Sequence, residues 1–499
     1  MSPRHVALAC VSGVLYGLAL ADESFSWIGW ICLAPLFAIS TRVRPGAATL
    51  LGVAWAVAAT AALSSWLPGA LEGYFGLARG PALLGWLAAA LLVNGPPYGL
   101  LCAWLSWAAR RRPLGPLGVG LGWLAAEYLR AHGPIPDPYA PLAASQLGTA
   151  WVQGADLVGA LGVGALVACG NALLAATVTP SLRGAAPRRE LLLALGVLAL
   201  FWIYGDSQLA HDFADGDSIR VALVQPGVAA GGGPRAQELA LERELELSAA
   251  AARNRPDLVF WPEYAIDFYL REPSAARERV LAASRALGAD LVLGGPHYRY
   301  AEPSPHYHTS VFLLRDGRVT GRYDKLRLVP FAEYAPLGGL LRAGSVEYEP
   351  GSSARLLEAS RVRIGAFLCA EVLFPEIARE LARSGAGVLV NPSNDGWFGS
   401  AGAASLQLRS AALRAIENRR PLVRPTTSGY SAVLDPLGRV LARGDLGVPA
   451  VIEAEISASH VITSYQRFGD VPALCAVTLA ALVTLWTRRS RVWRRRNSA

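Results

Sequence analysis

Three residues of this 499-residue chain have the side chains that a thiol acyl-transfer site needs. Lys325 is the only lysine among the 46 lysines and arginines. Because the guanidinium of arginine is a planar fork that stays protonated, it cannot replace a compact ammonium. A lysine kept at one position of so arginine-rich a chain therefore indicates that an ammonium is needed there. Cys369 and Glu263 would supply the nucleophile and the proton acceptor of such a site.

Cys369 is the candidate nucleophile because of where it stands in the chain. The other five cysteines lie in long apolar runs: Cys10, Cys32, Cys102, Cys169 and Cys475. Cys369 follows the apolar run 364–368 and precedes a predicted helix at 372–381, and a thiol near a helix N-terminus tends to ionise. The alternative is a buried structural cysteine. A disulfide within 206–468 is excluded, since that segment contains no second cysteine.

Lys325 and Glu263 have complementary expected roles. An ammonium near the thiol would lower the thiol pKa and would stabilise negative charge on an attacked carbonyl oxygen. Glu263 follows Pro262, which restricts the local backbone, and a carboxylate held there would accept and return a proton. The alternatives are an ordinary surface lysine and a solvated loop acid.

Glu333 and Glu371 are secondary candidates for a supporting role. Either carboxylate would hold the lysine or the base in place, and the alternative for both is a structural ion pair. A carboxylate next to Cys369 would raise the thiol pKa, so we expect Glu371 to point away from the thiol or to be paired itself.

The segment that carries these residues is predicted to be an α/β domain, because short β-branched runs alternate with amphipathic stretches. Strands are predicted at 219–224, 258–261, 290–294, 309–315, 362–368, 387–391 and 422–425, and helices at 235–254, 273–287 and 403–419. Glu263 and Cys369 each come just after a predicted strand, which is where ligands bind in open α/β sheets. Two loops rich in glycine and small residues, 335–348 and 398–405, are expected to be lids.

Apolar runs at both ends of the chain predict a membrane protein. The composition is 53 % hydrophobic and only 17 % charged, with a mean hydropathy of +0.32. Runs of about the 17–25 residues that cross a bilayer are predicted at eight places: 6–21, 25–40, 47–67, 81–108, 114–130, 155–179, 190–205 and 470–487. We therefore expect a membrane domain at 1–205, the α/β catalytic domain at 206–468, and a last helix with a basic tail at 469–499.

Arginine clusters predict the orientation in the membrane. They follow the second, fourth, sixth and eighth apolar runs, and the largest lies at 488–496. Since loops rich in arginine stay cytoplasmic, residues 206–468 are expected on the extracytoplasmic face. The net charge of +8 comes largely from these clusters, so no nucleic-acid partner is expected. The first run, which ends in Ala19-Leu20-Ala21, also fits a cleaved signal peptide, and cleavage would leave 206–468 on the same face.

Several short motifs occur in a characteristic order. Those of the α/β segment are Trp261-Pro262-Glu263, Tyr323-Asp324-Lys325, Leu328-Val329-Pro330-Phe331-Ala332-Glu333, Cys369-Ala370-Glu371, Asn394-Asp395-Gly396-Trp397-Phe398-Gly399, Arg414-Ala415-Ile416-Glu417 and Thr426-Thr427-Ser428-Gly429. Those of the apolar part are Ala125-Ala126-Glu127-Tyr128-Leu129-Arg130 and Ala155-Asp156-Leu157-Val158-Gly159, which leads to Asn171. The α/β motifs resemble the nitrilase, or carbon-nitrogen hydrolase, superfamily, and the whole set resembles the apolipoprotein N-acyltransferase family.

This resemblance implies an αββα sandwich with a Glu263, Lys325 and Cys369 triad, set among helices of a bacterial inner membrane. It implies that Cys369 takes an acyl chain from a phospholipid as a thioester and passes it to the α-amine of diacylglyceryl-cysteine on apolipoproteins. The backbone N–H of Ala370 would help Lys325 to hold the oxyanion, and Trp397 belongs to the supporting residues. No metal or organic cofactor is implied.

The chain departs from the family pattern at supporting positions only. Ala332 stands where glycine is usual, and Ala370 stands where an aromatic residue is common. Leu408 follows Gln407 where a histidine is often found. These departures leave the triad intact and leave the preferred lipid and acyl chain open.

Two other functions fit parts of the sequence. A membrane-tethered amidase that uses water would carry the same triad, although one span would be enough for a tether. A scaffold with an inert nitrilase domain would not need the triad, yet all three members are present. N-acyl transfer therefore remains the preferred interpretation.

Overall fold

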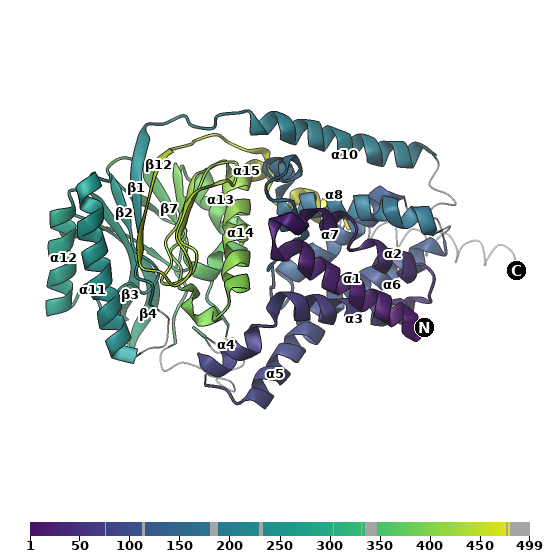
Figure 1. Cartoon of the computed structure of the whole chain (residues 1–499), viewed down its shortest axis with the longest axis horizontal. Helices are drawn as coiled ribbons and strands as arrows, with labels where there is room; N and C mark the ends of the chain where they lie inside the picture. The colour runs from purple at the N-terminus through teal and green to yellow at the C-terminus, as the bar shows by residue number, and fades with distance from the viewer. Residues whose placement is uncertain are drawn as a thin grey trace, which may run out of the picture. The chain divides into compact units, whose positions relative to one another are not determined.

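The computed structural model describes residues 1–74, 76–111, 115–179, 188–228, 233–302, 304–330, 332–334, 347–475 and 478–479. The chain divides into two compact units (Figure 1). The first consists of Met1–Ser65, Leu83–His211 and Phe468–Ala499. The second consists of Trp66–Ala82 and Asp212–Arg467. A short stretch between two apolar helices, 66–82, thus belongs to the second unit, which the sequence did not predict.

The first unit is helical. Its main helices are α1 (Pro3–Ala21), α2 (Ala34–Ser40), α3 (Pro45–Ser64), α6 (Gly95–Ala109), α7 (Pro116–His132), α8 (Ala155–Val178) and α10 (Arg188–Leu209), and α5 (Arg79–Ala88) leads into it. Within the described residues, six helical stretches are long and apolar enough to cross a membrane: Pro3–Ala21, Glu23–Ser40, Pro45–Ser64, Arg79–Ala109, Ala150–Val178 and Arg189–Leu209. The predicted run 114–130 forms α7, which has 17 residues. The run 470–487 lies largely outside the described residues, so the predicted number of eight is not confirmed.

Small residues let the apolar helices pack closely. A Cβ on Gly13 of α1 would come 2.5 Å from the carbonyl oxygen of Trp55 on α3. A Cβ on Gly52 of α3 would come 2.3 Å from the carbonyl oxygen of Tyr98 on α6. Helices in lipid associate through such close backbone approach, because burial from water does not drive their association.

Several polar side chains inside the first unit are paired, which offsets the cost of placing them in an apolar surrounding. The Tyr98 hydroxyl donates to Glu127, and the Nη2 of Arg130 lies 3.0 Å from Oε2 of the same carboxylate. The Nη1 of Arg130 donates to the carbonyl oxygen of Tyr139 at 2.7 Å. Glu127 and Arg130 are both buried, so this motif forms an ion pair within the helical unit.

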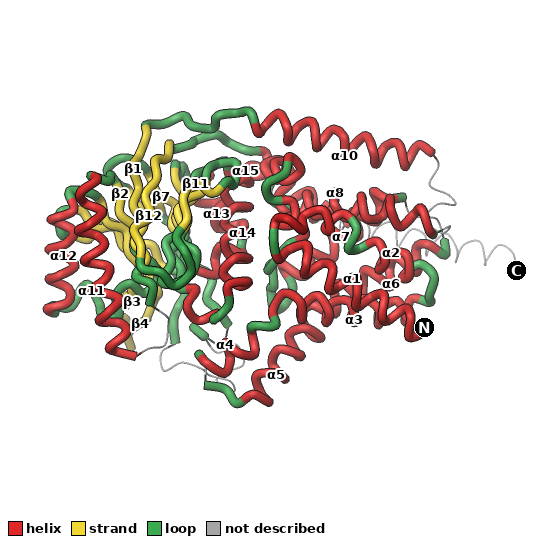
Figure 2. Tube along the Cα trace, viewed as in Figure 1, coloured by secondary structure: helices red, strands yellow, loops and turns green. Residues whose placement is uncertain are grey.

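The second unit contains two six-stranded sheets (Figure 2). The first sheet has the order β12-β1-β2-β3-β4-β5, with β1 (Ser218–Gln225), β2 (Leu258–Phe260), β3 (Asp290–Ala301), β4 (Ser304–Arg315), β5 (Arg318–Asp324) and β12 (Ala450–Ser457). The second has the order β11-β10-β9-β8-β7-β6, with β6 (Leu356–Glu358), β7 (Arg363–Ala366), β8 (Val388–Val390), β9 (Leu422–Arg424), β10 (Ala432–Leu434) and β11 (Val440–Arg443). The central strands β1-β2-β3 and β7-β8-β9 are parallel.

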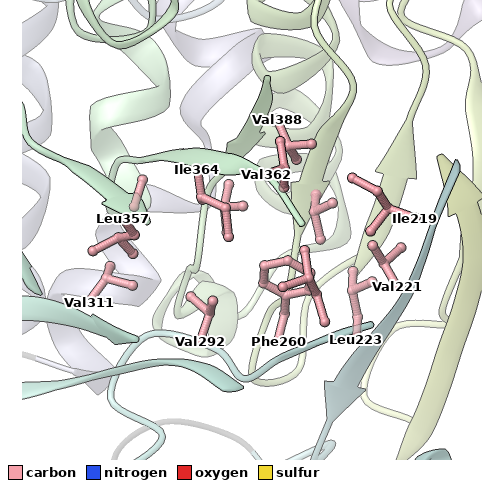
Figure 3. Packing of buried hydrophobic residues seen from close by; sticks show 14 of the residues in the cluster. Ile219, Val221, Leu223, Phe260, Val292, Val311, Leu357, Val362, Ile364 and Val388 are labelled. Carbon is pink, nitrogen blue, oxygen red and sulfur yellow. The ribbon is translucent and has the colours of Figure 1, made fainter. Parts of the chain in front are cut away.

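A hydrophobic core lies between the two sheets (Figure 3). It joins Leu223, Phe260 and Val292 of the first sheet to Ile364 and Val388 of the second, all buried. Helices α11 (Gly233–Ala251) and α12 (Ala275–Leu287) cover the outer face of the first sheet, and α13 (Pro375–Arg383) and α14 (Ala401–Asn418) cover the second. The layers are therefore helix, sheet, sheet, helix, and the predicted αββα sandwich is confirmed.

The predicted elements of this unit are found, and several strands were missed. The missed strands are β5, β6, β10, β11 and β12. The prediction of a loop at 398–405 is wrong beyond Ser400, because α14 (Ala401–Asn418) begins at Ala401. The Ser400 hydroxyl caps this helix by accepting the N–H of Ala403. Most of the other expected lid, 335–348, lies outside the described residues.

Candidate active site

Glu263 lies just past the end of β2 and is buried. The N–H of Gly294 on β3 donates to the carbonyl oxygen of Pro262 at 3.1 Å, which fixes this turn against the sheet. Only glycine fits there, since a Cβ at position 294 would come 2.7 Å from the Cα of Glu263. The Oε1 of Glu263 accepts from Lys325 Nζ at 3.3 Å, and Oε2 accepts the N–H of Asn394 at 3.1 Å.

Lys325 follows β5 and is 1 % exposed. Its N–H donates to the carbonyl oxygen of Thr309 on β4 at 2.9 Å, so the sheet sets its position. Its Nζ donates to Glu263 and, at 2.7 Å, to Oε1 of Glu333. Burial opposes the charge, but these two carboxylates outweigh burial and raise the pKa of Lys325 well above its usual value. The residue is therefore a permanent ammonium at the centre of the site.

Cys369 follows β7 and opens a short 3-10 helix, Cys369–Leu373. Its φ is +47°, a left-handed conformation that costs a non-glycine residue about 1–3 kcal/mol. Contacts with the segment after β8 hold this backbone: the N–H of Cys369 donates to Pro392 O at 2.9 Å, and Asn391 Nδ2 donates to Cys369 O at 3.3 Å. The turn places the thiol close enough to the Glu263 carboxylate for the two groups to shift each other's pKa.

The acidity of the thiol corrects one expectation from the sequence. Burial and the Glu263 carboxylate raise the pKa of Cys369 well above its usual value, and Lys325 lowers it only in part. The helix that follows is a five-residue 3-10 turn, too short to favour a thiolate as a long α-helix would. The resting group is therefore a thiol. Burial also raises the pKa of Glu263, which makes this carboxylate a stronger proton acceptor.

Glu333 contacts the lysine directly. Its Oε1 accepts from Lys325, and its Oε2 accepts the N–H of Val329 at 2.7 Å. Because both oxygens are bound, the carboxylate cannot rotate away from the ammonium. Glu333 is thus a second carboxylate partner of Lys325 besides Glu263.

Glu371 is paired, as expected, and its carboxylate binds backbone groups that follow Lys325 and that precede Cys369. Its Oε1 accepts the N–H groups of Leu326 at 2.6 Å and Arg327 at 2.9 Å, and its Oε2 accepts the N–H of Leu368 at 2.6 Å. The Tyr323 hydroxyl donates to the same carboxylate. Burial, opposed by these backbone N–H groups, raises the pKa of Glu371 to about 7. This residue links the loop of Lys325 to the turn of Cys369.

Comparisons with known proteins show the family of the chain. The carbon-nitrogen hydrolase family matches residues 220–465, and the apolipoprotein N-acyltransferase N-terminal domain matches residues 12–173. An apolipoprotein N-acyltransferase of Geobacter metallireducens is 32 % identical over 501 residues, which cover 96 % of this chain and 94 % of that protein. The chain belongs to the apolipoprotein N-acyltransferase family. It is an enzyme, and like its family it is an N-acyltransferase with membrane helices.

Other members of the apolipoprotein N-acyltransferase family match over similar lengths. The protein of Caulobacter vibrioides is 31 % identical, covering 97 % of this chain and 95 % of its own. Among solved structures, an amidase from Nesterenkonia sp. covers 50 % of this chain and 94 % of its own at 20 % identity, with a TM-score of 0.39. A nitrilase-superfamily protein of Saccharomyces cerevisiae covers 50 % of this chain and 93 % of its own at 21 % identity, with a TM-score of 0.38.

Trp397 lies in an aromatic cluster that the sequence did not predict. Its ring centroid is 5.9 Å from that of Trp66 and 6.3 Å from that of Tyr74. Trp66 also lies 5.1 Å from Phe398. Trp66 and Tyr74 flank α4 (Leu67–Gly73), which contacts the 3-10 turn of Trp397. The spacing of about 320 residues between these rings leaves no sequence signal that pairs them.

The remaining predicted site residue is Ala370, which lies next to Cys369 in the 3-10 helix. Its proposed role depends on its backbone N–H and not on its methyl group. For metals, the described part of the chain contains no group of three or more His, Cys, Asp or Glu side chains that could hold an ion.

Proposed function

We propose that this chain transfers a fatty acyl chain from a phospholipid to the N-terminal α-amine of diacylglyceryl-cysteine in apolipoproteins. The observation that carries the proposal is the buried Lys325, bound to both Glu263 and Glu333, with the Cys369 thiol beside the Glu263 carboxylate. This arrangement forms a thioester without a metal or an organic cofactor. The family named in the comparisons supports a lipid donor and a lipoprotein acceptor.

The first half-reaction acylates the cysteine. Glu263 takes the thiol proton of Cys369, and the sulfur attacks the ester carbonyl carbon of the phospholipid. Lys325 and the backbone N–H of Ala370 stabilise the oxyanion, a contribution of about 3–4 kcal/mol per donor in comparable sites. The C–O bond then breaks, the lysophospholipid oxygen takes the proton from Glu263, and a thioester remains on Cys369.

The second half-reaction forms the amide. The uncharged α-amine of the lipoprotein attacks the thioester carbonyl carbon, and Glu263 takes one proton from the attacking nitrogen. Lys325 and Ala370 again hold the oxyanion. The C–S bond breaks, the sulfur of Cys369 regains the proton from Glu263, and the enzyme returns to its resting thiol. The lysophospholipid leaves before the lipoprotein amine reacts with the acyl-enzyme, so the kinetics are ping-pong.

The same proposal includes the placement of the chain. Residues 1–205 form the membrane domain, 206–468 the catalytic domain and 469–499 the last helix with its basic tail. The arginine clusters support a catalytic domain on the periplasmic face of a bacterial inner membrane. Both substrates are lipids in a bilayer, which explains why a nitrilase-like domain is joined to several apolar helices.

Intact mass of the detergent-purified chain after incubation with phospholipid tests this function. We expect an added acyl mass on the wild type and none on Cys369→Ala. A diacylglyceryl-cysteine peptide should then remove the acyl group and appear as its amide. Release of free fatty acid whether or not the peptide is present would indicate an amidase-like hydrolase instead. Absence of any adduct on the wild type would leave an inert nitrilase domain as the better interpretation.

A further inference from the structure

Arg424 is a buried guanidinium that takes no part in the two half-reactions. It ends β9 and is fully buried. Its Nη1 donates to Oδ1 of Asn391, and its Nη2 donates to Oδ1 of Asp395 at 2.8 Å. Both partners belong to the segment that follows β8. Burying an arginine is costly unless its partners are well placed, so these two contacts are the reason that the side chain is retained there.

The contact with Asn391 reaches the nucleophile. Asn391 Nδ2 donates to Phe367 O at 2.9 Å and to Cys369 O at 3.3 Å. Because Arg424 has only donors, it binds the amide oxygen and so directs the NH2 group toward these carbonyls. Without Arg424, the amide oxygen would keep only the longer contact from Ser393 Oγ at 3.3 Å, and the support that Asn391 gives to the left-handed backbone of Cys369 would weaken.

The contact with Asp395 reaches the general base. Asp395 follows Asn394, whose N–H donates to Oε2 of Glu263 at 3.1 Å. The other oxygen of Asp395, Oδ2, has no hydrogen-bond partner within the described residues, and a Cβ on Gly429 would come 2.2 Å from it. Arg424 is thus the cation that holds this buried carboxylate.

We propose that Arg424 is a positioning residue for acyl transfer, which holds the nucleophile through Asn391 and the general base through Asp395. The proposal rests on the function proposed above. It adds a physical link between two segments, since one guanidinium cross-links the groups that orient Cys369 and Glu263.

The test must separate positioning from folding, and Arg420 provides the control. Arg420 is also buried, but the hydrogen bonds that it donates within the described residues go to backbone carbonyls, such as those of Ala386 and Val461, both at 2.7 Å. Three full-length variants would be prepared: Arg424→Gln, Arg424→Lys and Arg420→Gln. The thermal stability of each would be measured. Two rates would be measured: acyl-enzyme formation from phospholipid by intact mass, and alkylation of Cys369 by iodoacetamide, followed by peptide mapping.

We expect Arg424→Gln to form the acyl-enzyme about 10- to 100-fold more slowly, the usual effect of losing hydrogen bonds to a charged group. Arg424→Lys, which keeps a charge but reaches one partner, should recover part of the rate. Arg420→Gln should acylate as the wild type does. If Arg424→Gln acylates at the wild-type rate, or loses no more than Arg420→Gln of equal stability, the proposal is wrong.

The pH dependence of alkylation gives a second readout that a purely structural role would not change. The charged groups around Cys369 are Glu263, Lys325 and Asp395. Burial raises the pKa of Asp395 and Arg424 lowers it. Removal of Arg424 should therefore raise the pKa of Asp395 further. We expect an extra inflection in the Arg424→Gln profile that disappears in Arg424→Gln combined with Asp395→Asn. An unchanged profile would overturn the proposal.

If Arg424→Gln does not fold, Asn391→Ala and Asp395→Asn each remove one of the two contacts of Arg424. Both variants should then slow acylation if the proposal holds. Alkylation needs no phospholipid. A wild type that alkylates at Cys369 but forms no acyl adduct would therefore contradict the proposed function, while the alkylation profiles would still decide the role of Arg424.

Discussion

The Nζ atom of Lys325 lies 2.7 Å from Oε1 of Glu333, and both side chains are buried. The ammonium therefore has a second carboxylate partner besides Glu263. In the proposed mechanism the charge of Glu263 changes during each half-reaction, and Glu333 would hold the ammonium in place while Glu263 is protonated.

Replacement of Lys325 by arginine should abolish most of the activity although the charge is kept. A guanidinium is larger and planar, and cannot fit between Glu263 and Glu333 as an ammonium does. We expect Lys325→Arg to lower the rate of acyl-enzyme formation by about 10²–10³, as the loss of an oxyanion donor does elsewhere. The exposed Arg327, which pairs with Glu376, offers the control Arg327→Lys. Wild-type acylation by Lys325→Arg would contradict this role.

Substitution of Glu263 should have opposite effects on alkylation and on acyl transfer. The Glu263 carboxylate raises the pKa of Cys369, whereas Lys325 lowers it. In Glu263→Gln the thiol pKa therefore falls, and iodoacetamide should alkylate Cys369 at lower pH than in the wild type. Acylation from phospholipid should be lost, because no group remains to protonate the leaving oxygen. Slower alkylation together with retained acylation would refute this assignment.

The wild-type pH profile of acylation follows from the same groups. Glu263 must be ionised to accept the thiol proton, and burial raises its pKa above the ordinary value of 4.5. The acid limb should therefore lie above pH 4.5, and activity should fall as the pH drops through it. The rate of acyl-enzyme formation across pH 4–9 measures this limb, and a midpoint at or below 4.5 would show that the base is not desolvated.

Glu244 should make the catalytic unit less stable at high pH. It is buried in α11, neither oxygen has a hydrogen-bond partner within the described residues, and burial raises its pKa well above 4.5. Since the unfolded chain ionises near 4.5 and the folded chain does not, the stability is greatest below that pH and is lost as the pH rises toward the folded pKa.

The test is thermal unfolding between pH 5 and 9. Glu244→Gln cannot ionise, so its melting temperature should fall less with rising pH than that of the wild type. Glu246→Gln, at an exposed position of the same helix, should behave as the wild type does. Identical pH dependence in Glu244→Gln and the wild type would mean that Glu244 is ionised and paired.

Replacing Arg130 alone should lower the free energy of unfolding more than replacing both members of the buried pair Glu127 and Arg130. Arg130→Leu leaves a buried carboxylate without its cation, which costs about 3–5 kcal/mol in comparable pairs. Glu127→Gln combined with Arg130→Leu removes both charges and should recover part of that loss. Unfolding in detergent of the wild type, the single variants and the double variant measures the coupling. Additive losses would show that the two charges do not interact.

The proposed triad could be selected from the sequence because its chemistry restricts residue type. A unique lysine, Lys325, and a single cysteine outside the apolar runs, Cys369, are visible without any structure. The parallel strands that precede Glu263 and Cys369 have only three and four residues, but they lie in continuous apolar runs, which is why the sequence predicted them. Four of the missed strands, β5, β6, β11 and β12, lie at sheet edges, where pairing with distant segments decides the conformation.

Only the tertiary structure decided how these groups behave. The sequence predicted a thiolate at Cys369, but burial and the nearby Glu263 make it a thiol. It could not assign Glu333 to the lysine or Glu371 to the backbone of both loops, because carboxylate partners are chosen by distances across the fold. Residue types and their order specify which chemistry is possible, whereas proton affinities and positions depend on burial and long-range contacts that exist only in the folded chain.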